Sequence, residues 1–276
     1  MGYLITSMLL LALNNVIWKY MVSHSNPLAI MVKRALLTSS IGIFILAVFF
    51  REILDYDSFN EFMFISFTCT VGFLGLLMML NGLKDSNLSH FLHYSLLSGI
   101  FVGSWLLFVE NQFTNRYVIG VGLVLSGFFL FYLNRRHDSA TISSRTHFQL
   151  FMMSLCFALS GILQWYHLKT HEPLLLVIHQ EVVVFLLAAG TTWVFRIKRI
   201  PVFNADKIPL MAIIIFLALL CGMLGLKETD PLIANIIGLF TPVTTILLGS
   251  LMLKEKLAWS SLLSLVLMLC GAYFLK

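Results

Sequence analysis

Long apolar runs, separated by short polar breaks, follow one another along the whole chain. A membrane-spanning helix needs about 20 mostly apolar residues. Because unpaired backbone groups are too costly in hydrocarbon, each such run is expected to be an α-helix. The pattern predicts ten spans: Tyr3–Val22, Leu28–Phe50, Phe62–Leu83, Leu88–Val109, Tyr117–Leu133, His147–Leu168, Leu174–Phe195, Ile208–Leu226, Leu232–Leu253 and Ala258–Leu275.

The breaks between these runs carry turn-forming or charged residues, as in Ser23–Pro27 and Lys84–Asn87. The longest of them, Asn134–Arg145, holds only 12 residues, which leaves no room for a soluble domain between spans. We therefore predict an all-α, multi-pass protein of the cell membrane, that is, an inner or plasma membrane.

Composition supports lipid as the solvent of this chain. Hydrophobic residues make up 59% and charged residues 11% of the 276 positions, whereas soluble domains have roughly 45–50% apolar and about 25% charged residues. Basic residues of membrane proteins collect in loops on one side of the bilayer. The net charge of +5 is therefore no sign of a nucleic-acid partner.

The two halves of the chain share sequence features in the same order. Pro27 lies over Pro173 at the start of the second and seventh predicted helices, and Gly82–Asp85 later lies over Gly225–Glu228. This predicts two five-helix repeats, residues 1–138 and 139–276. Since five is odd, the second repeat enters the membrane inverted, an arrangement typical of secondary transporters with a central cavity and a midplane site.

Several residues stand where a known family has its motifs. In the first half these are Trp18, Lys19, Pro27 and Arg34, and in the second half Pro242, Leu253–Leu257 and Gly271. With them the chain resembles the ten-helix EamA-type members of the drug/metabolite transporter superfamily. It departs from that pattern at Leu13–Asn15 and Val109–Gln112, where the expected glycines are missing. The resemblance implies a helical bundle around a central cavity, alternating access and a small-molecule substrate, such as an amino acid, a sugar, a nucleotide sugar, a choline-like amine or a drug.

Four charged residues fall inside predicted helices: Lys19, Lys33, Arg34 and Glu181. Such residues are costly unless they are paired, hydrated or functional. Arg34 and Glu181 lie at similar depths in the second and seventh helices, so inverted halves bring them together near the midplane. Arg34 or Lys33 would bind an anionic substrate group, and Glu181 would take a proton, a cation or a substrate amine. The alternatives are a structural ion pair and, for Lys33, a side chain that reaches to the interface.

Polar and aromatic residues inside the spans complete the candidate site. Buried amides need a partner on another helix or on a ligand, and aromatic side chains could form cavity walls. His179, Gln180 and Glu181 cannot share one helix face, so at most two of them line a cavity. The predicted substrate-binding residues are Asn15, Trp18, Arg34, His93, Tyr94, Gln164, Trp165, Gln180 and Glu181.

Neither a metal nor another cofactor is expected. The four cysteines have no paired spacing. His90 and His93 are spaced to share a metal ion but lack a third ligand, and His167 and His171 are interpreted as a solvated helix end.

A secondary transporter is therefore the predicted function, with an amino acid or a related zwitterion or organic anion as substrate. A coupled proton or cation and the lipid bilayer are the other expected partners, and the protein is expected to be a monomer or a homodimer. The alternatives are a carrier of a cationic amine such as choline, and an intramembrane enzyme acting on a lipid-linked substrate. The enzyme would need clustered acidic or nucleophilic residues, which the sequence does not offer. Ten helices in two inverted sets fit neither a seven-helix receptor nor a typical oligomeric channel.

Overall fold

The computed structural model describes residues 1–49, 56, 58–110, 115–134, 143–196, 202–229, 231–238, 240–253 and 259–274. All regular structure in these residues is helical, which confirms the all-α prediction for this part of the chain. The helices are α1 (Gly2–Val22), α2 (Pro27–Phe49), α3 (Phe59–Lys84), α4 (Leu88–Glu110), α5 (Asn115–Asn134), α6 (Ser144–His167), α7 (Pro173–Val194), the short 3-10 helix η3 (Ala205–Lys207), α8 (Ile208–Glu228), α9 (Pro231–Gly238), α10 (Phe240–Met252) and α11 (Trp259–Phe274).

Six of the described helices are long and apolar enough to cross a membrane, namely α1, α2, α3, α6, α7 and α8 together with η3. The count of ten spans stays a prediction. The expected ninth span contains two helices, α9 and α10, and residue 239 between them lies outside the described residues. Most of the closing motif, Lys254–Leu257, also lies outside them.

Helix starts follow from local sequence. Ser58 and Ser143 precede α3 and α6, and their hydroxyls accept hydrogen bonds from the backbone N–H groups of Glu61 and Thr146, at 3.2 and 3.1 Å. Such caps satisfy N–H groups that have no partner within the helix. Pro173 is the first residue of α7, a position that needs no N–H donor.

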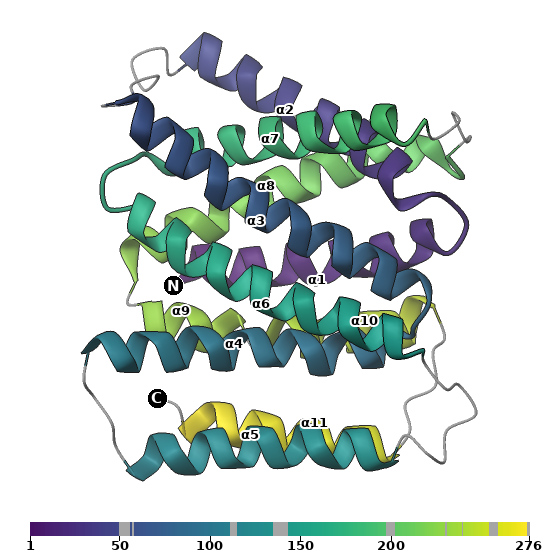
Figure 1. The fold of residues 1–276 in the computed structure, drawn as a ribbon, viewed down its shortest axis with the longest axis vertical. Coiled ribbons are helices and arrows are strands. Elements are labelled where there is room, and N and C mark those ends of the chain that lie inside the picture. The colour runs from purple at the N-terminus through teal and green to yellow at the C-terminus, as the bar shows by residue number, and fades with distance from the viewer. Residues whose placement is uncertain are drawn as a thin grey trace.

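The connections between helices meet in two groups at opposite ends of the bundle. At one end, the backbone N–H of Phe203 donates to Ser25 Oγ (2.8 Å), which joins the α7–α8 and α1–α2 connections. At the other, His171 in the α6–α7 connection bonds through Nε2 to Glu61 Oε1 at the start of α3 (2.7 Å). We call these the Ser25 end and the His171 end. Since α1 leads to the first and α6 to the second, the two helices run in opposite directions (Figure 1).

Two glycines allow close helix contacts that correspond between the halves. A Cβ on Gly82 of α3 would lie 2.6 Å from Leu150 Cδ2 in α6, and one on Gly225 of α8 would lie 2.6 Å from Leu4 Cγ in α1. Both helix pairs pack extensively. The glycines that marked the repeat in the sequence therefore act where two helices approach each other.

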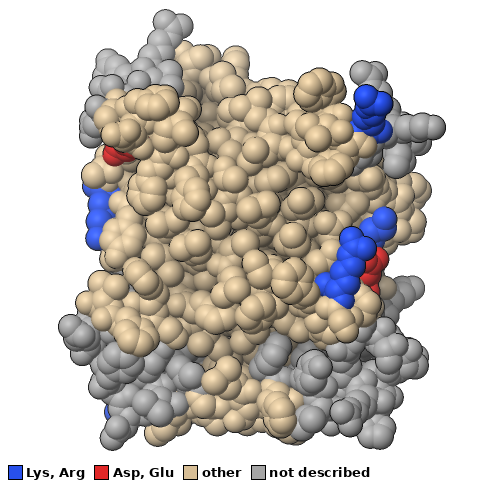
Figure 2. All heavy atoms as spheres, in the orientation of Figure 1, with Lys and Arg blue, Asp and Glu red and all other residues tan. Residues whose placement is uncertain are grey.

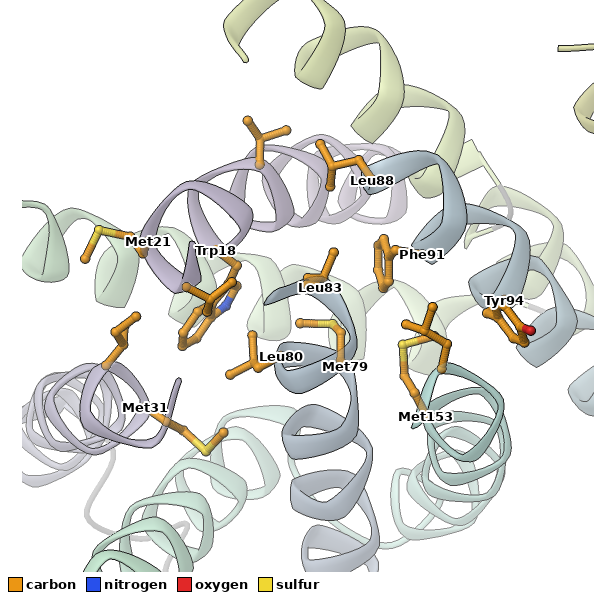
Figure 3. Packing of buried hydrophobic residues seen from close by; sticks show 14 of the residues in the cluster. Trp18, Met21, Met31, Met79, Leu80, Leu83, Leu88, Phe91, Tyr94 and Met153 are labelled. Carbon is orange, nitrogen blue, oxygen red and sulfur yellow. The ribbon is translucent and has the colours of Figure 1, made fainter. Parts of the chain in front are cut away.

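The main apolar core lies mostly between α1, α2, α3, α4, α6, α7 and α8. Trp18 of α1 is 1% exposed and faces Leu80 of α3, which is fully buried (Figure 3). Large apolar side chains also cover the outside of the bundle, among them Phe44, Trp193 and Leu251, which are 65%, 82% and 77% exposed. Figure 2 shows charged residues of the described part only toward the two edges where helices end, as a lipid-facing surface requires.

Candidate functional site: a polar cavity beside a buried ion pair

A cavity of about 390 Å³ lies between the helices, within the range of roughly 300–1,000 Å³ typical of small-molecule sites. Its wall combines apolar side chains with amides, hydroxyls and two charged groups. The lining residues are Leu11, Asn14, Asn15, Trp18, Arg34, Gly72, Leu76, Met79, Phe91, Ser95, Ser98, Gly99, Phe157, Ser160, Gly161, Gln164, Gln180, Glu181, Val184, Ile215, Leu219, Asn235, Gly238, Thr241 and Pro242.

The α1 and α6 walls use the same positions of the two halves. When the halves are aligned so that Pro27 matches Pro173, every cavity-lining residue of α1 matches a cavity-lining residue of α6. The α1 residues are Leu11, Asn14, Asn15 and Trp18, and their α6 counterparts are Phe157, Ser160, Gly161 and Gln164. The spacing of three, one and three places each set on one helix face. The same offset carries Arg34 of α2 onto Gln180 of α7.

The offset that places Gly82 over Gly225 relates the remaining walls. It carries Gly72 and Leu76 of α3 onto Ile215 and Leu219 of α8. It also carries three lining residues of α4 onto three that follow α8: Ser95, Ser98 and Gly99 correspond to Gly238, Thr241 and Pro242. Most of the cavity wall is therefore contributed by corresponding positions of the two halves, with different side chains at most of them.

Arg34 and Glu181 form an ion pair in this wall. Arg34 Nη1 donates to Glu181 Oε2 at 2.7 Å, and the two side chains are 1% and 3% exposed. The Arg34 guanidinium carbon also lies 5.9 Å from the centre of the Trp18 ring, within reach of a cation–π contact. Arg34 and Glu181 thus lie together, as the sequence led us to expect. The distance is compatible with both interpretations of the pair, as a substrate-binding site and as a structural ion pair.

The amides of the wall are partly engaged with one another. Gln164 Nε2 donates to Gln180 Oε1 at 2.7 Å, which links α6 to α7. Asn235 Nδ2 donates to the Gly99 carbonyl at 2.9 Å. Each amide keeps further hydrogen-bonding capacity for a ligand.

Three predicted site residues lie away from the cavity. The Tyr94 hydroxyl is hydrogen-bonded to His147 Nδ1 at 2.6 Å, and His93 beside it is fully buried. The Trp165 ring lies 5.0 Å from the Tyr166 ring at an interplanar angle of 53°, and Lys169 Nζ lies 4.0 Å from the centre of the Trp165 ring. None of these three predicted residues, His93, Tyr94 and Trp165, is in the cavity wall. The reason is helix phase, since Trp165 follows the lining residue Gln164 and points about 100° away from it.

The remaining two charged residues of the predicted helices, Lys19 and Lys33, lie outside this ion pair. Lys19 Nζ donates to the carbonyls of Leu83, in the last turn of α3, and of Ser86, just after α3, at 2.7 and 2.5 Å. The carbonyls in the last turn of a helix have no partner within that helix. Lys33 is exposed on α2 and is absent from the cavity wall.

A hydrogen-bonded cluster fills the His171 end next to the cavity. His179 bonds to the Tyr56 hydroxyl through Nδ1 (2.7 Å) and to Ser66 Oγ through Nε2 (2.8 Å). Burial raises the pKa of Tyr56 to about 12, so its phenol stays protonated at neutral pH. His167 and His171 are 5% and 6% exposed, which corrects the interpretation of these residues as a solvated helix end. His179 thus bonds to Ser66 of α3, while Gln180 and Glu181 line the cavity. This agrees with the expectation that at most two of these three residues line a cavity.

Sequence reasoning missed several lining residues, among them Phe91, Ser95, Ser98, Phe157 and Ser160. Applied to the predicted residue Asn15, the repeat offset could have found one further lining residue, Gly161. No group of three or more His, Cys, Asp or Glu residues that could hold a metal ion occurs among the described residues.

These apolar helices around a partly polar cavity define a multi-pass membrane protein with an internal cavity. The sequence profile of the EamA-like transporter family matches residues 1–133 and 145–276, so the chain belongs to this family, which is one of membrane transporters of the drug/metabolite type. A search of curated proteins finds no significant match. A solved structure described as "Crystal structure of protein" is similar in fold, with a TM-score of 0.69 at 12% identity over 99% of this chain and 94% of the other.

Proposed function

We propose that this chain is a secondary transporter that moves a small polar metabolite across the cell membrane by alternating access. In this proposal ten transmembrane helices form two inverted five-helix repeats, residues 1–138 and 139–276, around the cavity. The substrate is an amino acid or a related zwitterion or organic anion, whose anionic group compensates Arg34 while a coupled proton or cation binds at Glu181. The observation that carries the proposal is the use of corresponding positions of both halves in one cavity wall.

Helix packing supports the inverted repeats. In the aligned halves α1 corresponds to α6, α2 to α7, α3 to α8, and α4 to α10. Contacts between the halves then have counterparts: α1–α8 corresponds to α6–α3, α1–α10 to α6–α4, and α2–α8 to α7–α3. All six contacts are present. The contact between α2 and α7 maps onto itself and is also present. Such a two-fold relation between oppositely directed halves is the arrangement in which secondary transporters bind substrate at the repeat interface.

Different contacts hold the helix connections together at the two ends of the bundle. The Ser25 end is held by the bond from Phe203 to Ser25 and by Asn204 Nδ2, which donates to the Tyr20 hydroxyl at 3.0 Å. The His171 end is held by the His171–Glu61 and His179–Tyr56 bonds. In an alternating-access cycle one set of contacts opens while the other remains, so the substrate reaches the cavity from one side at a time.

The ion pair makes a cationic amine a less favourable substrate. Such a ligand would need the Glu181 carboxylate, which already accepts from Arg34 at 2.7 Å. It would leave the guanidinium buried without a counter-charge, which is strongly unfavourable.

A matched pair of glycine variants tests the role of the cavity. A Cβ on Gly161 or on Gly190 would meet no atom within 4 Å, so both helices can accept a leucine at these positions. Gly161 lines the cavity and Gly190 does not. Gly161→Leu would therefore narrow the cavity without a clash at its Cβ, and Gly190→Leu is its control.

The assay offers a mixture of metabolites to proteoliposomes and measures what enters the lumen. We expect the unaltered protein and Gly190→Leu to accumulate the same solute and Gly161→Leu to lose this activity, while all three keep similar melting temperatures. Undiminished flux in Gly161→Leu would contradict the role of the cavity. Chemical turnover of a solute in detergent, with no second compartment, would indicate an enzyme instead.

A further inference from the structure

The contacts that join the two halves at the ends of the bundle use corresponding positions of the repeats. The alignment that matches the prolines at the starts of α2 and α7 also matches Ser25 with His171. The alignment that matches the close-contact glycines of α3 and α8 also matches Asn204 with Glu61. All four side chains are hydrogen-bonded to the opposite half. The two ends are therefore built on one plan with different side chains.

The chemistry of these contacts differs between the ends. At the Ser25 end, a serine hydroxyl accepts from a backbone N–H at 2.8 Å, and an asparagine amide donates to the Tyr20 hydroxyl at 3.0 Å. At the His171 end, the corresponding residues are ionisable, and His171 Nε2 lies 2.7 Å from Glu61 Oε1. Histidine is the side chain that ordinarily changes charge between pH 5 and 8. The contact at the His171 end can therefore respond to pH in this range, whereas its counterpart is neutral throughout.

Protonation strengthens the contact of His171 with Glu61. A neutral imidazole still donates one hydrogen bond, but an imidazolium adds the attraction between opposite charges. The side chains of His171 and Glu61 are only 5% and 22% exposed, so salt screens this attraction less than it screens a surface pair. A proton on His171 thus stabilises the closed arrangement of this end.

Two further histidines lie near His171, and each of them faces hydroxyl groups. His167 Nε2 bonds to Thr68 Oγ1 at 2.9 Å, and His179 bonds to the hydroxyls of Tyr56 and of a serine in α3. Burial raises the pKa of Tyr56 to about 12, so its phenol offers no negative charge at neutral pH. A proton on either of these histidines would add a positive charge beside His171 and loosen this end. The direction of the pH response therefore distinguishes His171 from its neighbours.

The other charged groups of the described residues near the two connections keep their charge over this range. Glu172, next to His171, pairs with Lys227 of α8 at 2.9 Å, and Lys169 Nζ lies over two aromatic rings of α6. At the opposite end, His24 is exposed, and its Nδ1 bonds to the Tyr20 carbonyl within the same half. His24 is thus a natural control, because it is a histidine in the corresponding connection that does not join the halves through a carboxylate.

We infer that the contact of His171 with Glu61 is a proton-dependent latch, which holds the His171 end closed when His171 is protonated and favours opening of that end when the proton is lost. The inference rests on the proposed alternating-access function and goes beyond it, because it assigns a response to pH to a pair outside the cavity wall. An acidic medium then favours the conformation that is closed at the His171 end, with or without a solute.

The test measures the opening of each end without any solute. The four cysteines are replaced by alanine, and spin labels are attached to cysteines at the exposed positions Asn60 and Thr170 of the His171 end, or Ser23 and Ala205 of the Ser25 end. Pulsed electron paramagnetic resonance in lipid nanodiscs gives the label distances at pH 5.5 and pH 8. On acidification we expect the ratio of short to long distances at the His171 end to rise about fivefold or more. That is the upper value for exposed ion pairs, and this pair is more buried.

Four variants identify the groups responsible. His171→Gln keeps an N–H donor but cannot be protonated, and Glu61→Gln removes the carboxylate, so both should abolish the response. His171→Lys should keep the end closed at both pH values, and His24→Gln should respond as the unaltered protein does. Glu61 is partly exposed, so Glu61→Gln gives a result even if His171→Gln does not fold.

Three results would overturn the latch. These are label distances that do not depend on pH at the His171 end, opening of that end on acidification, and a full response that remains in His171→Gln or Glu61→Gln. Closure of both ends together at pH 5.5 would also contradict it, because the Ser25 end has no counterpart of this ion pair.

The latch and the transport function fail in different ways. If the label distances follow pH as expected but no solute enters proteoliposomes, the latch stands and the transport function is wrong. If a solute enters but the distances at the His171 end are the same at both pH values, transport stands and the latch is wrong.

Discussion

The buried pair of Arg34 and Glu181 gives the most quantitative prediction. Its side chains are 1% and 3% exposed, and Nη1 and Oε2 are 2.7 Å apart. Removing one member leaves the other charge buried and uncompensated, which typically costs about 3–5 kcal/mol. Arg34→Met and Glu181→Met should each lose about that much of the free energy of unfolding.

The double variant should lose much less unfolding free energy than the sum of the losses in the two single variants. Replacing both members of a buried ion pair by apolar residues is often neutral or stabilising by about 1–4 kcal/mol. We therefore expect Arg34→Met/Glu181→Met to be close in stability to the unaltered protein. In the double-mutant cycle the interaction energy should exceed the roughly 0.5–3 kcal/mol usual for contacting residues.

Denaturation of the four proteins in the same mixed micelles provides the measurement. The double variant also separates stability from function, because it should fold and yet fail to transport the solute that the unaltered protein transports. The reasoning is refuted if the single losses are small and additive, since the two charges would then not compensate each other.

Three further predictions concern contacts outside the cavity. Lys19→Met should destabilise the protein by about 1.5–3 kcal/mol, because the carbonyl of Leu83 in the last turn of α3 and that of Ser86 just after it lose a charged donor; a melting temperature equal to that of the unaltered protein would argue against this role. Gly271→Ala should cost about 1–3 kcal/mol by overpacking, since its Cβ would lie 2.6 Å from a backbone oxygen of α5. Gly122→Ala, whose Cβ would meet no atom within 4 Å, is the matched control, and equal melting temperatures of the two variants would contradict the contact. Tyr56→Phe removes the hydroxyl bonded to His179 and should lower the unfolding free energy by about 0.5–1.5 kcal/mol, with no change expected if the bond is absent.

How far the sequence predicts the fold depends on what each signal reports. Apolar run length predicted the helices well, because lipid imposes that length on any spanning segment. The repeat signal at Gly82 and Gly225 was also informative, because a glycine is required where a leucine of a neighbouring helix leaves no room for a Cβ. The division of the expected ninth span into α9 and α10 has no comparable signal in its apolar sequence.

The site was harder to predict because the phase of a membrane helix is poorly encoded. A helix between lipid and protein is apolar on both sides, so neighbours such as Gln164 and Trp165 are equally plausible in a cavity wall. Charged residues were the exception. Arg34 and Glu181 were found from sequence because the cost of a charge in hydrocarbon restricts it to a few environments.

Counterflow tests alternating access most directly. Proteoliposomes loaded with an excess of the unlabelled solute are diluted into a trace of the same solute in labelled form. A carrier that reorients with its binding site occupied should accumulate label transiently above its equilibrium level, and Gly161→Leu should abolish this overshoot while Gly190→Leu retains it. Equilibration of the label without an overshoot in the unaltered protein, as through an open pore, would contradict the account.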